Sequence, residues 1–346
     1  TYIYPPKESM RIITDIFFFF CKEVPKWNTI SISGYHIREA GSNAVQELAF
    51  TLSNGKAYLK AALDNKLNIN VFAKRLSFFF NAHNHLFEEI AKFRAARRIW
   101  ANITKELGAT DIEAQKLRFH TQTGGSTLTA QQPMNNIVRV AVQTLAATMG
   151  GTQSLHTNGF DEALSLPTET AAGIALRTQQ IIAEESGICD TVDPWAGSYF
   201  MESLTDEVER EALKIIEKID AMGGAVKAIE QSYMQDAIAQ ASYAYQKAIE
   251  SKDKIIVGVN KYEVEETQTI PITKIDAAIE TQQVERLQRF KANRNLTEIS
   301  SCLQKIASSA EGNENLMPLV IDAVEKNCTL GEIAHCLRKV WGEYKA

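Results

Sequence analysis

Four short runs of β-forming residues, each followed by a helical stretch, constrain the fold of this 346-residue chain more than any other feature. The runs lie at 29–36, 75–81, 116–123 and 152–158, and each ends in polar residues. The helical stretches have the length of crossovers between parallel strands. In such units chemistry gathers where strands end and helices begin. The repeat therefore predicts four βα units with a functional site at the strand ends.

The pattern changes after residue 195. Residues 196–346 are predicted to be mainly helical, with one long helix over 225–251 and one short β-run at 254–260. We therefore divide the chain into a βα segment, 1–195, and an α-helical extension, 196–346.

Two local patterns on helices make specific predictions. Thr329 stands three residues before Glu332, the spacing of a capping box at a helix start. Arg94, Arg97 and Arg98 share one side of a helix, which predicts a solvated or ion-paired outer face.

Composition excludes several classes of function. The net charge of −5 gives no basic field for nucleic acid. No window approaches the roughly 18 apolar residues of a membrane span. The five cysteines lack CxxC spacing, so we expect reduced thiols. The chain is therefore predicted to be cytoplasmic, with neither nucleic acid nor membrane as a partner.

Three of the six histidines, His36, His120 and His156, fall at ends of predicted strands. Imidazoles from neighbouring strand ends can bind a metal or can hydrogen-bond and transfer protons. No Asp or Glu ligands accompany them, and the one His-x-His pair, His83 and His85, is expected in a loop. We favour hydrogen-bonding or acid roles for His36 and His120, and no directly bound metal.

Polar residues cluster after the third and fourth strands. Gln122 and two glycines follow His120, and Asn158 and Glu162 follow His156. Amides and hydroxyls suit a ribose or a thioester carbonyl, and glycines let a ligand approach the backbone. Arg75 and Ser77 open the second strand, where a cation can bind phosphate.

Seven strings in this sequence carry a resemblance to a known family. They are SISGYHIREAG (31–41), RLSFFFN (75–81), HTQT (120–123), GGTQSLHTNGFDEA (150–163), EESG (184–187), DPWAGSY (193–199) and VGVN (257–260). They resemble the large, catalytic subunit of the methylmalonyl-CoA mutases, within the adenosylcobalamin-dependent acyl-CoA mutase family. The similarity runs along the whole chain.

This resemblance implies a TIM (β/α)8-type barrel, of which only about four βα units are present, followed by the α-helical extension. It implies an isomerase that uses adenosylcobalamin to move the thioester group of an acyl-CoA between adjacent carbons, as in methylmalonyl-CoA to succinyl-CoA. The acyl-CoA would thread the barrel axis, with the corrin over the strand ends.

Matching motifs imply the roles of individual residues. His36 resembles the histidine that hydrogen-bonds the thioester carbonyl, and Tyr35 the aromatic residue that helps to displace the adenosyl group. The implied substrate and CoA contacts are Asn28, Arg75, Ser77, His120 and Gln122. The implied cofactor contacts are Glu39, Gln122, Asn158, Glu162 and Ala163.

Two parts of the family fold have no match here. An Asp-x-His-x-x-Gly cobalt-ligand motif is missing from the sequence, which implies a separate cobalamin-binding small subunit. The second unmatched part is the N-terminal half of the barrel. The four-stranded sheet expected here would then have two unpaired edges. We therefore expect a chain that supplies the N-terminal half-barrel, or self-association, and no activity from this chain alone.

Alternatives remain open. Ser126 replaces a tryptophan found in methylmalonyl-type enzymes of some lineages, so an isobutyryl-CoA or 2-hydroxyisobutyryl-CoA mutase is also considered. A metal-dependent barrel hydrolase or lyase that uses His36, His120 and His156 is a second possibility. A non-catalytic assembly subunit is a third.

Overall fold

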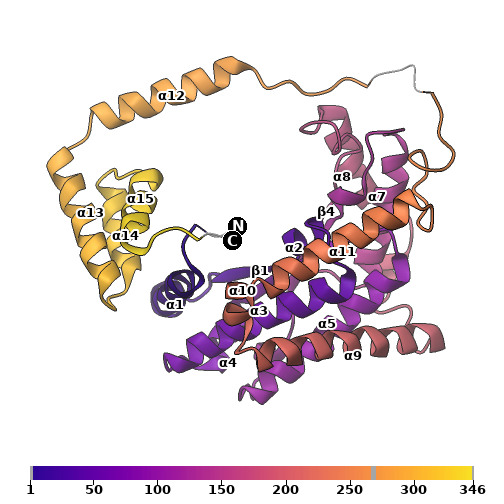
Figure 1. The fold of residues 1–346 in the computed structure, drawn as a ribbon, viewed down its shortest axis with the longest axis horizontal. Coiled ribbons are helices and arrows are strands. Elements are labelled where there is room, and N and C mark those ends of the chain that lie inside the picture. The colour runs from indigo at the N-terminus through magenta and orange to yellow at the C-terminus, as the bar shows by residue number, and fades with distance from the viewer. Residues whose placement is uncertain (1–2, 266–269, 345–346) are drawn as a thin grey trace. The chain divides into compact units, whose positions relative to one another are not determined.

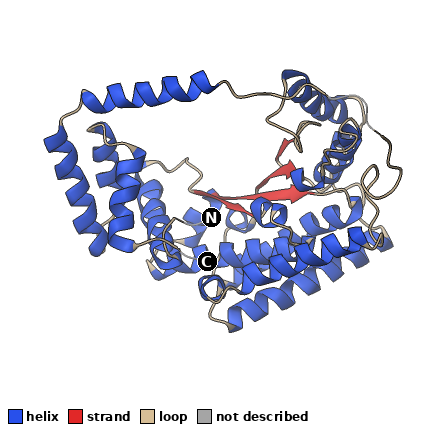
Figure 2. Cartoon of the chain, turned by 45° about the horizontal axis from the view of Figure 1, so that its top comes forward, coloured by secondary structure: helices blue, strands red, loops and turns tan. Residues whose placement is uncertain are grey.

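One parallel sheet of four strands organises the chain (Figure 1; Figure 2). The computed structural model describes residues 3–265 and 270–344. The strands are β1 (Ile30–Ser33), β2 (Leu76–Ala82), β3 (Phe119–Thr123) and β4 (Ser154–His156), and they pair in chain order. All three pairings are parallel. The α/β class and the four predicted strands are thereby confirmed.

Helices fill most of the remaining chain. Before and among the strands lie α1 (Pro6–Glu23), α2 (Tyr35–Glu39), α3 (Ala44–Asp64), α4 (Ile69–Phe72), α5 (Leu86–Glu106), α6 (Ile112–Gln115) and α7 (Asn135–Met149). After β4 come α8 (Glu169–Glu184), α9 (Tyr199–Ala221), α10 (Ala225–Glu230), α11 (Tyr233–Glu250), α12 (Ala277–Ala292), α13 (Leu296–Glu311), α14 (Leu316–Glu325) and α15 (Leu330–Trp341). Thr329 and Glu332 form the predicted capping box before α15.

The chain divides into two compact units. The larger unit comprises residues 30–60 and 68–273 and contains the whole sheet. The smaller unit comprises residues 1–29, 61–67 and 274–346. In the smaller unit the C-terminal helices bury an apolar cluster that includes Ile306. The predicted division into segments 1–195 and 196–346 was based on the sequence pattern and not on contacts between residues. It stays a prediction.

The two faces of the sheet differ in polarity, because side chains alternate along a strand. Phe78 and Phe80 are buried on the face that the helices cover. Trp100 of α5 meets the Phe78 ring edge-on, with ring centroids 4.7 Å apart, and Phe93 of α5 stacks on Phe119. The opposite face carries residues that are at least partly exposed and mostly polar: Ser33, Ser77, Phe79, His120, Gln122, Ser154 and His156. The site must lie on this open face.

Strand register sets the open-face residues in two rows. Phe79 pairs with His120, which pairs with Ser154. One step towards the carboxyl ends, Gln122 pairs with Asn81 on one side and with His156 on the other. The predicted residues of β3 therefore lie in the middle of the sheet.

A fully buried charge cluster lies behind the carboxyl end of β2. Lys92 of α5 donates hydrogen bonds to Glu47 of α3 at 2.7 Å and also contacts Glu89. Arg38 of α2 donates to Glu89 at 3.2 Å. Buried charges are tolerated only when paired and hydrogen-bonded. Burial raises the pKa of Glu47, and Glu89 adds to this, whereas the Lys92 cation opposes it.

Three predictions about local structure are wrong. The helix expected over 225–251 is broken at Ser232, which has a positive φ of 58° and separates α10 from α11. The β-run at 254–260 forms a turn with one isolated bridge, Val257 to Lys261. Arg97 does not face outwards: its Nη2 donates to the carbonyls of Gly150 and Gly151 at 2.6 and 2.8 Å.

The other two members of that arginine group are ion-paired, as predicted. Arg94 pairs with Asp193 and Glu202. Arg98 pairs with Asp206 and Glu209. None of the helices in the described part of the chain is long and apolar enough to span a membrane.

Candidate functional site

The turn from β1 into α2 presents Tyr35, His36 and Glu39 at the carboxyl edge of the sheet. It begins at Gly34, whose N–H donates to the Phe79 carbonyl at 2.7 Å. A Cβ at position 34 would lie 2.3 Å from Thr51 Oγ1, so only glycine fits against α3. This close approach brings α2 directly over the strand end.

Tyr35 contacts residues from several strand ends at this edge of the sheet. Its ring stacks on Phe79, with centroids 4.7 Å apart and planes 6° from parallel. Burial, together with the Glu39 and Glu162 carboxylates, raises the pKa of Tyr35. Hydrogen bonds with Asn158 and Gln122 offset part of that rise. Tyr35 is therefore a neutral phenol that lies among four of the predicted cofactor residues.

Gln122 and Asn158 are linked across adjacent strands. Gln122 Nε2 donates to Asn158 Oδ1 at 2.9 Å. Asn158 is buried, and its backbone N–H and side-chain Nδ2 donate to the hydroxyl and carbonyl oxygens of Thr123 at 2.9 and 3.1 Å. The orientation of both amides is thereby set by the end of β3.

Glu39 joins α2 to the loops that follow β2 and β3. Its Oε1 accepts a hydrogen bond from Asn81 Nδ2 at 2.6 Å. Its Oε2 accepts one from the backbone N–H of Ser126 at 2.8 Å, and the Ser126 hydroxyl donates to Oε1 at 3.2 Å. Ser126 thus holds the Glu39 carboxylate through both its backbone N–H and its hydroxyl.

Gly125 forms the floor of a polar cradle. A Cβ there would lie 3.0 Å from Asn158 Nδ2, 3.2 Å from Glu39 Oε2 and 3.4 Å from Glu162 Oε1. Desolvation, with repulsion from Glu39 and Asp161, raises the pKa of Glu162. An amide donor beside two carboxylates matches the hydroxyls of a ribose. The donor set therefore fits a ribose, with exposed Ala163 next to Glu162 in the chain.

His36 and His120 lie on either side of Phe79. The His36 ring meets Phe79 edge-on, with centroids 6.1 Å apart, and the His120 centroid is 5.2 Å from it. His36 Nδ1 is 2.8 Å from Ser33 Oγ, and His120 Nδ1 is 2.7 Å from Ser154 Oγ. Each imidazole therefore keeps Nε2 for another partner.

Burial lowers the pKa of both His120 and His156, and for His120 the neighbouring His156 adds to the effect. These rings are consequently neutral near pH 7. The described residues contain no group of three or more His, Cys, Asp or Glu side chains arranged to hold a metal ion. His83 and His85, the His-x-His pair, lie between β2 and α5, as expected. This geometry gives no support to the metal-dependent alternative.

Arg75 and Ser77 lie at the opposite end of β2. Ser77 Oγ donates to the Ile30 carbonyl at 3.1 Å, so it joins β1 to β2. Arg75 precedes the strand, about 20 Å from Asn81 at the other end, at 3.3 Å per residue. Asn28 is exposed and belongs to the smaller unit, whereas the other predicted residues belong to the larger one.

Sequence reasoning assigned no role to three residues that shape the site: Asn81, Phe79 and Ser33. Phe79 follows Ser77 by two residues, so strand alternation places both on the open face. Ser33 stands three residues before His36, a spacing that local side-chain bonds often use. Nothing in the sequence indicates that Asn81 reaches Glu39.

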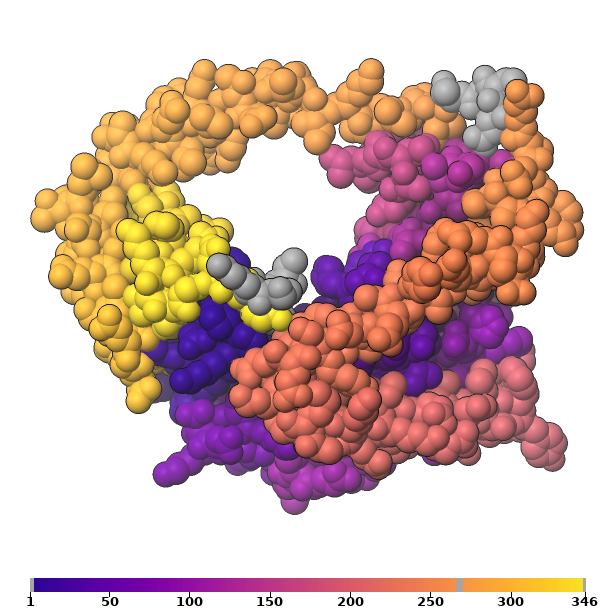
Figure 3. Space-filling view, viewed as in Figure 1, coloured from indigo at the N-terminus to yellow at the C-terminus, as the bar shows by residue number. Residues whose placement is uncertain are grey.

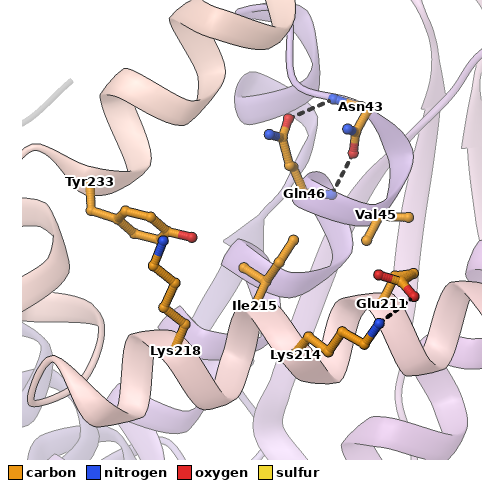
Figure 4. A pocket seen from close by; sticks show the side chains of 8 residues that line it. All are labelled: Asn43, Val45, Gln46, Glu211, Lys214, Ile215, Lys218 and Tyr233. Atoms are coloured by element: carbon orange, nitrogen blue, oxygen red, sulfur yellow. Dashed lines mark hydrogen bonds and ion pairs between the residues drawn. The ribbon is translucent and has the colours of Figure 1, made fainter.

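A separate cavity of about 520 Å³ lies elsewhere in the larger unit (Figure 4). It lies between the start of α3, the middle of α9 and the start of α11. Lys218 lies over the Tyr233 ring, with its Nζ 4.5 Å from the ring centroid, and Asn43 and Gln46 hydrogen-bond each other. None of the predicted site residues lines it.

Comparisons with known proteins agree on one family. The family model described as methylmalonyl-CoA mutase matches residues 1–343. The chain is 48% identical over 348 residues to the probable mitochondrial methylmalonyl-CoA mutase of Caenorhabditis elegans, covering 100% of this chain and 47% of that protein. It is 47% identical to the methylmalonyl-CoA mutase of Escherichia coli K12, covering 99% and 48%. The mitochondrial human enzyme is also 47% identical, covering 100% and 46%. The chain thus spans about half the length of these relatives.

Proposed function

Because this chain belongs to the methylmalonyl-CoA mutase family, we propose that it supplies the substrate-facing and cofactor-facing residues of an adenosylcobalamin-dependent acyl-CoA mutase. The observation that carries the proposal is the convergence of Tyr35, Gln122 and Asn158 beside Glu39 and Glu162. The reaction is the isomerisation of methylmalonyl-CoA to succinyl-CoA. Adenosylcobalamin, when bound, supplies the radical chemistry; the residues of this chain bind, orient and shield.

Substrate lies along the open face of the sheet in this proposal. Arg75, at the amino end of β2, binds a phosphate of the CoA arm, and Ser77 follows it along the strand. The acyl end reaches His36 and Tyr35 at the carboxyl edge, about 20 Å away, which suits the length of an extended thioester arm. Phe79 and His120 form the wall between the two ends.

His36 donates a hydrogen bond to the thioester carbonyl. For Nε2 to carry the proton, Nδ1 must accept a hydrogen bond, and the Ser33 hydroxyl, 2.8 Å away, can donate it. A donor at this oxygen stabilises negative charge that develops there while the thioester group migrates. Ser33 is thus a positioning residue that sets the tautomer of His36.

The cofactor-facing group comprises Glu39, Gln122, Asn158, Glu162 and Ala163. Asn158 and Glu162 would hydrogen-bond the ribose hydroxyls of the adenosyl group, and Glu39 orders the Gly125–Thr127 turn beside them. Tyr35 would lie next to the adenosyl group. This assignment combines the donor geometry with the resemblance of the motifs.

Partner chains complete the site. Within the described residues, β1 and β4 each pair on one side only, and exposed strand edges invite further pairing. We infer that the full enzyme is a (β/α)8 barrel, whose other strands come from a second polypeptide segment, and that a cobalamin-binding subunit supplies the cobalt ligand. A cytoplasmic location stays a prediction.

Reconstitution tests this function. The chain is combined with a cobalamin-binding subunit and a polypeptide carrying the other half of the family fold, and succinyl-CoA formed from methylmalonyl-CoA is measured by mass spectrometry. We expect adenosylcobalamin-dependent turnover that falls by 10²–10⁴-fold in His36→Ala. Unchanged turnover in His36→Ala would support a purely structural chain. Turnover of isobutyryl-CoA or 2-hydroxyisobutyryl-CoA instead would reassign the substrate and keep the site.

A further inference from the structure

Two arginines lie where the adjacent strands β2 and β3 begin, at the amino end of the open face. Arg75 directly precedes β2, and Arg118 directly precedes β3. Phe78 and Phe119 are register partners, and the Phe78 N–H donates to the Arg118 carbonyl at 2.8 Å. One step back along both strands, Arg118 is therefore the neighbour of Ser77 and shares the open face with it.

The Arg118 side chain extends towards Arg75. Its Nη2 donates to the carbonyl of Leu76, the residue after Arg75, at 3.4 Å. Among the described residues of the larger unit, the guanidinium of Arg118 has no other hydrogen-bond partner, so most of its five N–H donors are free. Burial lowers the pKa of Arg118, the Arg75 cation adds to this effect, and the Glu113 carboxylate opposes it. The two cations are therefore near enough to repel each other.

The carboxylates near these arginines already have other partners. Lys74 pairs with Asp111, and Lys116 pairs with Glu113. Among the described residues of the larger unit, no carboxylate forms an ion pair with either arginine. The amino end of the two strands therefore has more cations than its acidic residues neutralise.

Several cations on other surfaces of the larger unit are ion-paired. On α9 and α10, which form part of the surface seen in Figure 3, Lys214 pairs with Glu211 at 2.8 Å and Lys227 pairs with Glu230 at 2.7 Å. By contrast, two neighbouring and partly exposed arginines without a carboxylate partner are typical of a site for an external anion.

We propose that Arg118 joins Arg75 in a clamp of two guanidinium groups that holds one phosphate group of the CoA arm. This inference rests on the proposed function, in which Arg75 alone is assigned to that phosphate. A guanidinium presents its N–H donors as a planar fork that matches phosphate oxygens, so two forks can bind one phosphate from two sides. The bound anion would also offset the repulsion between the two cations.

The chemistry of coenzyme A fits this position. Its phosphates, a diphosphate and a 3′-phosphate, lie at the nucleotide end of the molecule, far from the thioester. Arg75 lies about 20 Å from the carboxyl edge of the sheet, at 3.3 Å per residue. The clamp would therefore hold the nucleotide end while the acyl end reaches His36 and Tyr35.

Binding of coenzyme A to the full chain tests the clamp, because both arginines belong to this chain. Titration calorimetry is carried out with coenzyme A and with 3′-dephospho-coenzyme A, and binding of pantetheine, which lacks phosphate, is followed by NMR. Arg118→Gln should raise the dissociation constant for coenzyme A about tenfold or more and leave that for pantetheine within about twofold. Equal weakening of the dephospho form would identify the diphosphate as the bound group, and unchanged binding of that form would identify the 3′-phosphate.

A double-mutant cycle tests whether the two arginines hold the same phosphate. The cycle combines Arg75→Gln, Arg118→Gln and the double variant. Two groups that bind one anion are coupled, so the double variant should weaken coenzyme A binding by clearly less than the product of the two single effects. An effect equal to that product would mean two separate anions and would overturn the shared clamp.

Two further variants separate binding from general charge and from folding. Lys116→Gln is the matched control, because Lys116 lies two residues from Arg118 but is already paired with Glu113; it should change the dissociation constant for coenzyme A by less than about threefold. Arg118→Lys keeps the charge and loses the fork, so its effect should lie between wild type and Arg118→Gln. Circular dichroism checks the fold, and the lysine variant decides the question if the glutamine variant does not fold.

Three results would overturn the clamp. They are a wild-type chain without measurable coenzyme A binding, an Arg118→Gln variant with the affinity of wild type, and equal weakening of coenzyme A and pantetheine. Phosphate-dependent binding without turnover in the reconstituted enzyme would leave the clamp in place and overturn the proposed function. Normal turnover together with unchanged coenzyme A affinity in Arg118→Gln would overturn the clamp alone.

Discussion

Asn81 and Glu39 share a hydrogen bond of 2.6 Å that connects the candidate site to the buried charges behind the sheet. The backbone N–H of Asn81 donates to Glu47 at 2.8 Å, and its carbonyl accepts from Lys92 at 2.6 Å. Asn81 cannot move without disturbing this cluster. Glu39, on the surface of the site, is therefore positioned from the interior.

We predict that Lys92→Met destabilises the chain by about 3–5 kcal/mol, because it leaves Glu47 as a buried carboxylate without a direct ion-pair partner and Glu89 with Arg38 alone. The free energy of unfolding is measured by urea titration. The control is Lys214→Met, which removes a surface pair with Glu211 and should cost at most about 1 kcal/mol. Equal effects of the two substitutions would contradict a structural role for the buried cluster.

Gly125→Ala should weaken cofactor binding and leave the fold intact. The new methyl group would lie 3.0 Å from Asn158 and 3.2 Å from Glu39, in the space that the adenosyl group is proposed to use. Titration of the reconstituted complex with adenosylcobalamin measures the affinity. Gly173→Ala is the control: it lies inside α8 with open space around it. That variant should gain about 0.5–1 kcal/mol of stability and bind cofactor as wild type does.

Arg75→Gln should raise the KM for an acyl-CoA without a matching fall in kcat, because Arg75 lies far from the reacting end of the substrate. Loss of a charged hydrogen bond to phosphate is expected to raise KM about tenfold or more. A truncated thioester that lacks the nucleotide end is the control and should not distinguish the variant from wild type. A fall in kcat alone would place Arg75 in a different role.

Acid should weaken the smaller unit through Glu332. Hydrogen bonds with Arg294 lower the pKa of Glu332 to about 2, against an unperturbed glutamate pKa of about 4.3. A folded pKa below the unfolded one gives stability that is present above about pH 4.3 and is lost as the pH falls towards 2. Glu332→Gln should be less stable at pH 7 and should lose less stability over that interval. Parallel pH profiles, followed by fluorescence, would argue against this linkage.

Much of the fold follows from local sequence patterns. Side chains alternate along β2, so Phe79 and Phe80 face opposite ways, with Phe80 buried and Phe79 half-buried. Thr329 and Glu332 predicted a helix start correctly, because a capping box needs only four consecutive residues. The strand ends gathered Tyr35, Gln122 and Asn158 because parallel strands bring their carboxyl ends to one edge.

The misses depend on tertiary contacts. Arg97 has the spacing of a surface residue, yet a turn 53 residues away supplies the carbonyls that bind it. The 254–260 run has strand composition but finds no neighbouring strand to pair with within the described residues. Asn81 has the sequence context of an ordinary strand-end residue, and its partner Glu39 belongs to a different βα unit. A short sequence window around Arg97 or Asn81 therefore does not contain the residue that binds it.

One face of the sheet is covered by helices and the other is open to solvent, and the proposed chemistry would take place on the open face. A carbon radical generated there would be quenched by its surroundings unless something first seals that surface. In the proposed assembly, the segment that pairs along β1 and β4 would also shield this face from solvent, so that activity would appear only once the sheet is enclosed.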